Sequence, residues 1–182
     1  MLTAAGVPFT AQPAGVDEDA AKASLVGLSP RDLADALAEL KALKVSARHA
    51  QALVLGSDSV VALADGTLLD KPESREQAAD HLRRMSGGTH RIWSAAVIAE
   101  SDRPVWRHVE AATLVVRTLS YSFIDAYLDA EWPAVAGCVG VFRIEGVGVQ
   151  LFDRIQGSHF TVLGLPLIPV LGYLRDRAIL GS

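Results

Sequence analysis

The 182-residue sequence predicts one domain of mixed α/β (α+β) class that spans residues 1–182. Half of the residues are hydrophobic and 21% are charged, which is typical of a chain that buries a globular core. Some segments carry apolar residues at helical spacing, whereas others are rich in β-branched residues and are bounded by turn signals. Because helices and strands do not alternate in strict βαβ order, a mixed sheet is favoured over a doubly wound parallel one.

The first half of the chain begins with a polar stretch, residues 1–27, in which no regular element is predicted. A helix is predicted from an N-cap at Ser29 to about residue 49, because Pro30 suits a first turn and leucines and alanines recur at helical spacing. A strand over residues 53–63 follows, and "ADG" at 64–66 predicts a turn before "TLLD".

The second half predicts helices and strands in irregular order. A Ser74–Gln77 capping box begins a helix that Gly87 and Gly88 end. The later elements, in chain order, are two strands over 91–100 and 104–119 joined at "SDRP", a short helix around 122–130, a glycine-rich strand-like stretch over 136–152, and a last helix from near Pro166.

Composition excludes several classes of protein. The formal charge of −4 argues against a nucleic-acid-binding surface spread over the whole protein. Cys138 is the only cysteine, so no intramolecular disulfide forms, as suits a reducing compartment. No membrane span or signal peptide is recognisable, so we expect a cytoplasmic protein.

Asp58 is the first candidate functional residue, because it interrupts the apolar run "LVLGSDSVVAL". On an extended strand its side chain shares one face with Gly56 and Val60. A carboxylate on such a face is costly unless it is paired, bound to a metal or placed at the edge of a cleft. The alternative is a turn at Gly56–Ser59, since glycine, serine and aspartate are common turn residues.

Lysines supply the second set of candidates. Lys71 precedes a proline that restrains its backbone, yet it is equally a solvated lysine after a hairpin. On the first helix, Lys44 falls inside the apolar stripe and Lys41 at its margin, so periodicity alone favours Lys44 as the inward one. Either side chain can instead reach water.

The remaining candidates are weaker. "SGGTH", residues 86–90, suits an anion-binding nest but equally caps the preceding helix. Glu145 lies among glycines that permit a close backbone approach or simply form bulges. Glu18 is most simply a carboxylate in a loop.

Motifs for other chemistry are absent. The five histidines lack metal-ligand spacing, and the chain has no G-x-S-x-G, no Walker loop and no G-x-G-x-x-G after a strand. Carboxylates, lysines and a hydroxyl–glycine segment remain. Together they fit a phosphorylated ligand with a divalent cation, because hard cations take carboxylate oxygens and lysines neutralise phosphate.

Four motifs in order, "GSDSVV…DGTLLDKP", "AADHLRRMSGGTH", "AGCVGVFRIEGVGVQLF" and "VLGLPL", resemble the Maf family of nucleoside triphosphate pyrophosphatases. The resemblance implies a Maf/ITPase-like fold, with an elongated mixed sheet, flanking helices and two lobes around a central cleft. It also implies hydrolysis of nucleoside triphosphates, often non-canonical ones, to monophosphate and pyrophosphate with Mg²⁺ or Mn²⁺. The implied role is house-cleaning or cell-division arrest, in a homodimer that binds neither nucleic acid nor membrane.

The resemblance also assigns residues. Asp58 matches the catalytic aspartate, which would bind the cation and activate water, and Lys71 matches the lysine that neutralises phosphate. Here the resemblance favours Lys41 over Lys44 as the substrate-binding helix lysine. By the same resemblance, Glu18 and Glu145 match positions that bind the metal. Glu145, Ser86 and Thr89 match positions that bind the substrate.

The sequence departs from the family pattern in two ways. Family members carry a strand and an S-x-x-R phosphate-binding loop just before the position at which "MLTAAGVPF" begins here, so this loop is expected to be missing and its contribution to triphosphate binding lost. Ser59 replaces a threonine, and "CVGVFRIEG" resembles members that act on 7-methyl-GTP, which carry a basic residue two places before the glutamate, the place of Arg143 here, although "SHFTVLGLPL" does not follow that subgroup. The competing hypotheses are a catalytically weak nucleotide-binding regulator of septum formation and a domain that shares only the fold.

Overall fold

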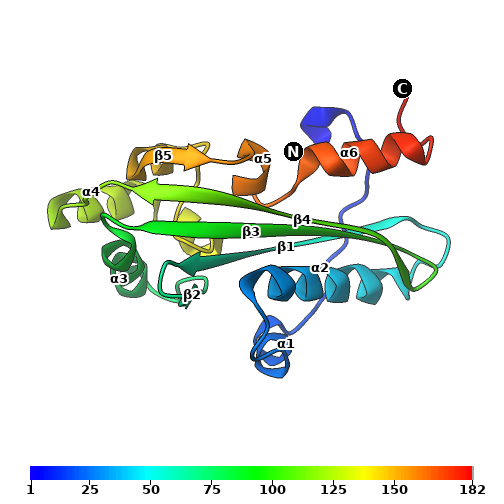
Figure 1. The fold of residues 1–182 in the computed structure, drawn as a ribbon, viewed down its shortest axis with the longest axis horizontal. Helices are drawn as coiled ribbons and strands as arrows, with labels where there is room; N and C mark the ends of the chain where they lie inside the picture. The colour runs from blue at the N-terminus through cyan, green and yellow to red at the C-terminus, as the bar shows by residue number, and fades with distance from the viewer. Residues whose placement is uncertain (182) are drawn as a thin grey trace. The chain divides into compact units, whose positions relative to one another are not determined.

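The computed structural model describes residues 1–181, which form a five-stranded sheet with helices packed on it (Figure 1). The strand order is β2-β1-β3-β4-β5. The strands are β1 (Val54–Leu63), β2 (Leu68–Leu69), β3 (Thr89–Glu100), β4 (Arg103–Val116) and β5 (Phe152–Gln156). The mixed α/β class predicted from the sequence is confirmed.

The helices are α1 (Glu18–Ser24), α2 (Pro30–Ser46), α3 (Arg75–Met85), α4 (Tyr121–Glu131), α5 (His159–Val162) and α6 (Leu167–Asp176). Four of the helices, α2, α3, α4 and α6, lie close to predicted segments, whereas α1 and α5 were not predicted. Ser29 caps α2 and accepts a hydrogen bond from the Asp32 amide, and Ser74 caps α3 by accepting one from the Gln77 amide. These caps explain why the two N-termini were predictable.

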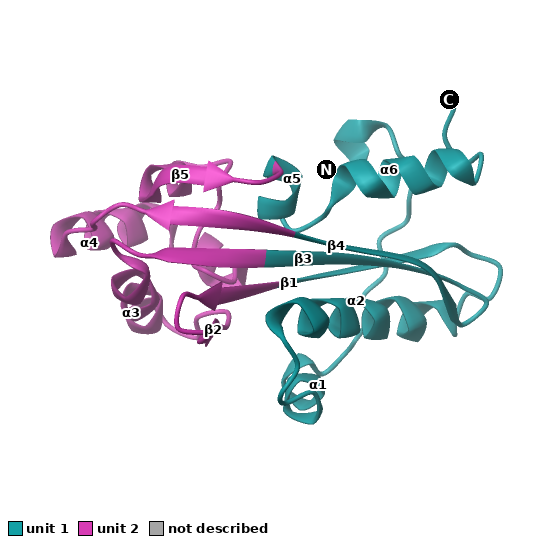
Figure 2. Cartoon of the chain, in the orientation of Figure 1, with its two compact units in different colours: residues 1–59, 93–110, 159–182 teal, residues 60–92, 111–158 magenta. Residues whose placement is uncertain are grey.

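The chain divides into two compact units, drawn in different colours in Figure 2. Unit 1 contains residues 1–59, 93–110 and 159–182, and unit 2 contains residues 60–92 and 111–158. Strands β1, β3 and β4 each contribute residues to both units. The β3–β4 hairpin turns in unit 1 at Ser101 and Asp102, which both have positive φ (51° and 57°), as a two-residue hairpin loop requires.

In unit 1, helices cover both faces of the strands, with α2 on one side and α6 on the other (Figure 1). The α6 side has an apolar core in which Leu167, Val170 and Leu174 pack with Ala96 and Val7. Burial of such side chains is the main stabilising contribution to folding. On the other side α2 presents a stripe of small buried residues, Ala34, Ala38 and Ala42.

In unit 2, α3 packs against α4, and the same unit contains an aromatic cluster. Phe142 and Phe152 form an edge-to-face pair with ring centroids 5.0 Å apart, and His90 lies about 6 Å from both rings. His90 is only 2% exposed, and neither of its ring nitrogens has a hydrogen-bond partner among the described residues.

Three local predictions are wrong. The stretch 136–152 is not a strand but contains turns and two 3₁₀ helices, Ala134–Gly137 and Val147–Leu151. Residues 1–27 contain α1 and a 3₁₀ turn at Thr3–Ala5 rather than no regular element. The alternative of a turn at Gly56–Ser59 is also excluded, because all four residues lie within β1.

In the described part of the chain, no helix combines the length and the apolarity that crossing a bilayer requires.

The burial of His90 predicts a pH-dependent stability. Burial lowers the pKa of His90 from its ordinary value near 6.5 to about 4. The folded protein therefore binds fewer protons than the unfolded chain, and this stability is lost as the pH falls from about 6.5 towards about 4. At about pH 5 we expect a loss of about 2 kcal/mol in the free energy of unfolding, measured by urea denaturation.

A His90→Leu variant should flatten this acid-side slope, because leucine cannot bind a proton. The exposed His49 supplies the matched control, since His49→Leu should leave the slope unchanged. Equal slopes in the wild type and His90→Leu would contradict the assignment.

Candidate active site

The site begins with a close contact between α2 and β1. A Cβ atom on Gly56 would lie 2.4 Å from the Ala38 carbonyl oxygen and 2.6 Å from the Ala42 nitrogen. Only glycine therefore fits at this position of β1. The contact places the backbone of the strand directly against the alanine stripe of the helix.

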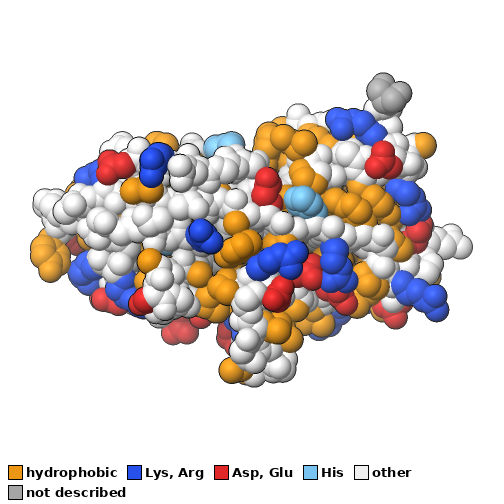
Figure 3. Space-filling model, in the orientation of Figure 1, with side chains coloured by type: hydrophobic (Ala, Val, Ile, Leu, Met, Phe, Trp, Pro, Cys, Tyr) orange, Lys and Arg blue, Asp and Glu red, His pale blue; other side chains and the backbone are white. Residues whose placement is uncertain are grey.

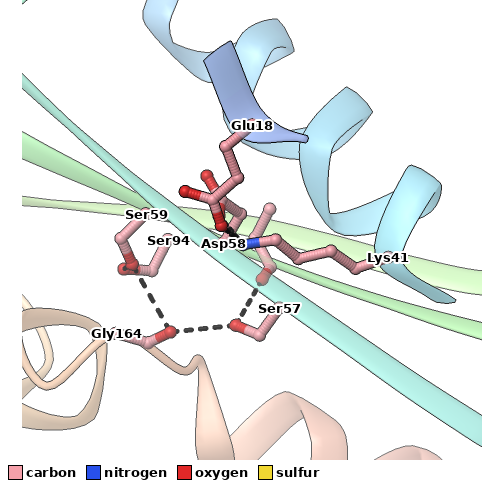
Figure 4. Close-up of polar contacts among 8 residues, drawn as sticks. Glu18, Lys41, Ser57, Asp58, Ser59, Ser94 and Gly164 are labelled. Carbon is pink, nitrogen blue, oxygen red and sulfur yellow. Dashed lines mark hydrogen bonds and ion pairs between the residues drawn. The ribbon is translucent and has the colours of Figure 1, made fainter. Parts of the chain in front are cut away.

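This contact brings Lys41 to Asp58. Asp58 shares a strand face with Gly56 and thus points towards α2, while Lys41 precedes Ala42 at the contact. Lys41 Nζ donates to Asp58 Oδ1, and it also lies 2.7 Å from Glu18 Oε1 (Figure 4). The side chains are 11% (Asp58), 21% (Lys41) and 30% (Glu18) exposed, so the cluster is partly buried.

Burial shifts both members of the central pair. Loss of solvation raises the pKa of Asp58 above its ordinary value, although the hydrogen bond and charge of Lys41 act in the opposite direction. Burial alone would lower the pKa of Lys41, but its hydrogen bonds to Asp58 and Glu18 raise the pKa above the ordinary value. The ammonium therefore stays charged, and Asp58 is a stronger base than a solvated aspartate.

Glu18 reaches this cluster because α2 anchors the segment before it. Lys44 donates to the Gly15 carbonyl oxygen, and Arg48 Nη2 donates to that of Pro13 at 3.1 Å. Asp17 then caps α1 by accepting from the Ala20 amide at 3.0 Å. Glu18 is thus the first residue of a helix. The sequence alone had suggested that it lies in a loop.

The inward lysine of α2 is Lys41. Lys44, which helical periodicity favoured, is exposed and contacts only the backbone of the Gly15 segment among the hydrogen bonds described. Periodicity was wrong here because α2 packs through small alanines, whose contact is closer than a leucine-based helical stripe predicts. The resemblance had selected Lys41.

The opposite face of β1 is fixed by serines. Ser57 Oγ lies 2.8 Å from the Ala95 carbonyl oxygen and 2.9 Å from that of Gly164, and its single proton can serve only one of them at a time. Ser59 Oγ pairs with Ser94 Oγ at 2.8 Å, near the Gly164 carbonyl oxygen (Figure 4). Ser94 also donates to the Thr161 carbonyl oxygen. These bonds hold β1 to β3 and to the segment around α5.

A cavity of about 310 Å³ adjoins the cluster inside unit 1. Its lining includes Gly15, Val16, Glu18, Lys41 and Ser57. Elsewhere on the face shown in Figure 3, basic and acidic side chains alternate over α2 and the strands beside it. In unit 1, Arg107 forms ion pairs with two acidic residues of α2, at 2.6 Å to Asp35 and 2.5 Å to Glu39.

Unit 2 contains the other predicted site residues. Lys71 is exposed directly after β2, and Glu145 is exposed in the segment between the two 3₁₀ helices. Both residues act on the charge of the Cys138 thiol. Burial is the main cause that raises the pKa of this thiol, the negative charge of Glu145 raises the pKa further, and the positive charge of Lys71 lowers it. Their roles toward a substrate stay predictions.

The "SGGTH" segment acts as a helix cap. The Ser86, Gly87 and Gly88 amides all donate to backbone carbonyl oxygens, and Ser86 Oγ accepts from the Leu119 amide at 2.8 Å. These amides are therefore not available as an anion nest. Thr89 is exposed at the start of β3, and the assignment of Ser86 and Thr89 to the substrate stays a prediction.

Sequence reasoning missed one charged pair in unit 2. Glu131, at the end of α4, is only 4% exposed and accepts from Arg143 Nε at 2.8 Å, while Arg143 itself is 40% exposed. A glutamate at a helix end before Trp132-Pro133 gives no sequence signal of burial. The ion pair fixes the guanidinium and leaves it accessible at the surface.

The donor chemistry of the cluster fits a hard divalent cation. Asp58 and Glu18 converge on one cationic atom, Lys41 Nζ, and carboxylate oxygens are the ligands that Mg²⁺ and Mn²⁺ prefer. Among the described residues, no group of three or more histidine, cysteine, aspartate or glutamate side chains is placed to hold a metal. Any cation at this cluster would thus need further ligands from water or substrate.

Comparison with known proteins identifies the relatives of this chain. A family model described as Maf-like protein matches residues 1–177. A nucleoside triphosphate pyrophosphatase of Sphingopyxis alaskensis is 49% identical, over 98% of this chain and 91% of the relative. Nucleoside triphosphate pyrophosphatase 1 of Jannaschia sp. is 50% identical over the same shares, and a 7-methyl-GTP pyrophosphatase of Rhizobium meliloti is 45% identical over 97% of this chain and 89% of the relative.

The contact at Gly56 predicts a large effect of one methyl group. Gly56→Ala should lower the free energy of unfolding by at least about 2 kcal/mol, because the added Cβ meets backbone atoms that cannot move aside. Urea denaturation measures the change. Gly172→Ala in α6 is the matched control: no atom lies within 4 Å of its added Cβ, so stability should stay the same or rise by about 0.5–1 kcal/mol. Equal stability of Gly56→Ala and wild type would refute the close contact.

Proposed function

The chain belongs to the Maf-like protein family, and from this membership we propose that it is a nucleoside triphosphate pyrophosphatase. The enzyme hydrolyses the bond between the α- and β-phosphates, so the products are a nucleoside monophosphate and pyrophosphate. The observation that carries the proposal is the partly buried Asp58, paired with Lys41, in a chain nearly half identical to relatives named for this activity.

We assign Asp58 as the general base. Its carboxylate takes a proton from the water that attacks the phosphorus atom. Lys41, which contacts Asp58 and Glu18 in this structure, supplies an ammonium that balances the negative charge developing on the phosphate. Lys71 in unit 2 is assigned the same neutralising role, with Ser86 and Thr89 as further substrate contacts.

A divalent cation, Mg²⁺ or Mn²⁺, belongs to this proposal. When bound, it would neutralise phosphate oxygens and make the phosphorus atom more electrophilic. Asp58 and Glu18 are the proposed ligands in unit 1, and the assignment of Glu145 to the metal rests on the family resemblance alone. A homodimer and a house-cleaning role complete the proposal and rest on the family resemblance alone.

The alternative of a catalytically weak regulator is less well supported. The curated relatives are named for pyrophosphatase activity over nearly the whole of this chain. In addition, a regulator that only binds nucleotide has no need of a base with a raised pKa.

A 7-methylated guanine nucleotide is the second candidate substrate, and a specific observation favours it. Glu131 holds the Arg143 guanidinium at the surface of unit 2, where its remaining N–H groups can donate to acceptors on a base. Glu145, two residues further along the chain, supplies a negatively charged carboxylate, which complements the positive charge of a methylated base. The 7-methyl-GTP pyrophosphatase of Rhizobium meliloti is consistent with this choice.

The activity is tested by pyrophosphate release from dTTP, UTP and 7-methyl-GTP with Mg²⁺ or Mn²⁺. We expect release by the wild type, none after chelation with EDTA, and a loss of about 10²–10⁴-fold in kcat in Asp58→Asn. Asp65→Asn changes an exposed turn residue and should retain full activity. No release with any of the three substrates would reject the proposal, and full activity of Asp58→Asn would reject Asp58 as the base.

The base preference is tested at Arg143. Arg143→Met should lower kcat/KM for 7-methyl-GTP about tenfold more than for UTP, since one charge-assisted hydrogen-bonding group to the base is lost. Arg154→Met, at an exposed position of β5, controls for the general loss of a positive charge. An equal loss for both nucleotides would instead indicate contact with the phosphates.

A further inference from the structure

Lys41 occupies the position that the proposed cation requires. Its Nζ atom contacts Asp58 Oδ1 and Glu18 Oε1, which come from a strand and from the first residue of α1 (Figure 4). These are the two carboxylates of unit 1 that we assign to the metal. One ammonium therefore satisfies both ligands at once.

We propose that Lys41 is a built-in substitute for the divalent cation, holding Asp58 and Glu18 in place until the metal displaces it and the released ammonium binds the substrate phosphates. This inference rests on the proposed function. It adds that Lys41 pairs first with Asp58 and Glu18 and then, once the metal has bound, with the substrate phosphates.

The Lys41 ammonium and a divalent cation cannot occupy the space between Asp58 and Glu18 at the same time, because both are positively charged. An ammonium and a divalent cation between the same two carboxylates would repel each other strongly in a partly buried cluster, where solvent screens charges poorly. Without Lys41, in turn, Asp58 and Glu18 would repel each other, since like charges at close range oppose ionisation of both. Lys41 thus stabilises the metal-free protein and competes with the metal.

The cavity beside Lys41 can accept its side chain after the metal binds. The side chain is 21% exposed, and the cavity of about 310 Å³ that it lines is bounded by Gly15 and Val16. Four rotatable bonds let the ammonium move into this space while α2 stays fixed against β1 at Gly56. No core residue has to move.

The exchange couples metal and substrate. A released ammonium needs a new anionic partner, and the triphosphate provides one. Metal binding is therefore weak in the protein alone and becomes tighter when nucleotide is present, and by reciprocity the metal tightens nucleotide binding by the same factor.

The test measures Mn²⁺ binding by calorimetry without nucleotide. Lys41→Met should bind Mn²⁺ at least about tenfold more tightly than wild type, because no ammonium competes. Its thermal midpoint without metal should be lower than that of wild type, and Mn²⁺ should raise the midpoint by more than it does in wild type. Arg31→Met is the matched control: it removes a positive charge from the same helix but not from the cluster, because Arg31 is exposed and pairs with the neighbouring Asp32, so Mn²⁺ affinity should not change. Unchanged or weaker binding by Lys41→Met overturns the proposal.

A second measurement uses the wild type and does not depend on the variant folding. Lysine acetylation, followed by mass spectrometry, reports how accessible each ammonium is. Mn²⁺ should increase the labelling of Lys41 several-fold and leave Lys44 unchanged, and addition of an α,β-methylene nucleotide should protect Lys41 again. Labelling of Lys41 that Mn²⁺ leaves unchanged or reduces contradicts the exchange.

These readouts are independent of turnover. If the wild type releases no pyrophosphate but Lys41→Met binds Mn²⁺ more tightly, the proposed function fails while the exchange stands. If the wild type is active but the affinity is unchanged, the exchange fails while the proposed function stands.

Discussion

The close contact between α2 and β1 at Gly56 is the constraint on which the site depends. A helix that packed through leucines would lie farther from the strand, and the lysine stem would have to span the difference. The alanine stripe removes that distance, and glycine removes the Cβ that would otherwise strike the Ala38 carbonyl oxygen. Two residues beyond Gly56, on the same strand face, Asp58 then meets Lys41. Backbone packing and side-chain chemistry are thus one feature, and packing cannot be loosened without separating the charged pair.

The same contact explains how a carboxylate is tolerated inside a strand. Burial of Asp58 opposes its ionisation, and Lys41 offsets that cost with a hydrogen bond and an opposite charge. Glu18 adds a second acceptor, so the ammonium is satisfied from two directions. The result is a carboxylate held in a defined position, beside a cavity that its partners Lys41 and Glu18 line. A buried pair optimised for stability alone would be sealed from solvent, whereas in this one the side chains of Asp58 and Lys41 stay partly exposed.

The sequence predicted those parts of the molecule whose signals are local. Ser29 and Ser74 mark helix starts because a cap acts within three residues, and "SDRP" marks a hairpin because its turn is made by its own backbone. Asp58 was found because a charge in an apolar run is conspicuous. Glu131 and His90 were missed because their burial depends on residues distant in sequence. The stretch 136–152 was misread as a strand because valines at alternating positions indicate β structure, although Val141 adopts a positive φ of 58°.

That misread stretch has its own physical logic. Tyr127 donates to the Val141 carbonyl oxygen at 2.9 Å in the buried interior, which fixes the unusual backbone of Val141. A Cβ on Gly148 would lie 2.5 Å from the Arg143 carbonyl oxygen, so the chain folds back tightly over Arg143. A regular strand would point Arg143 and Glu145 along one face, whereas the compact loop sets the Arg143 guanidinium against the buried Glu131. Each unit thus uses an ion pair to aim one charged group: in unit 1 Lys41 positions the carboxylate of Asp58, and in unit 2 a carboxylate positions a guanidinium.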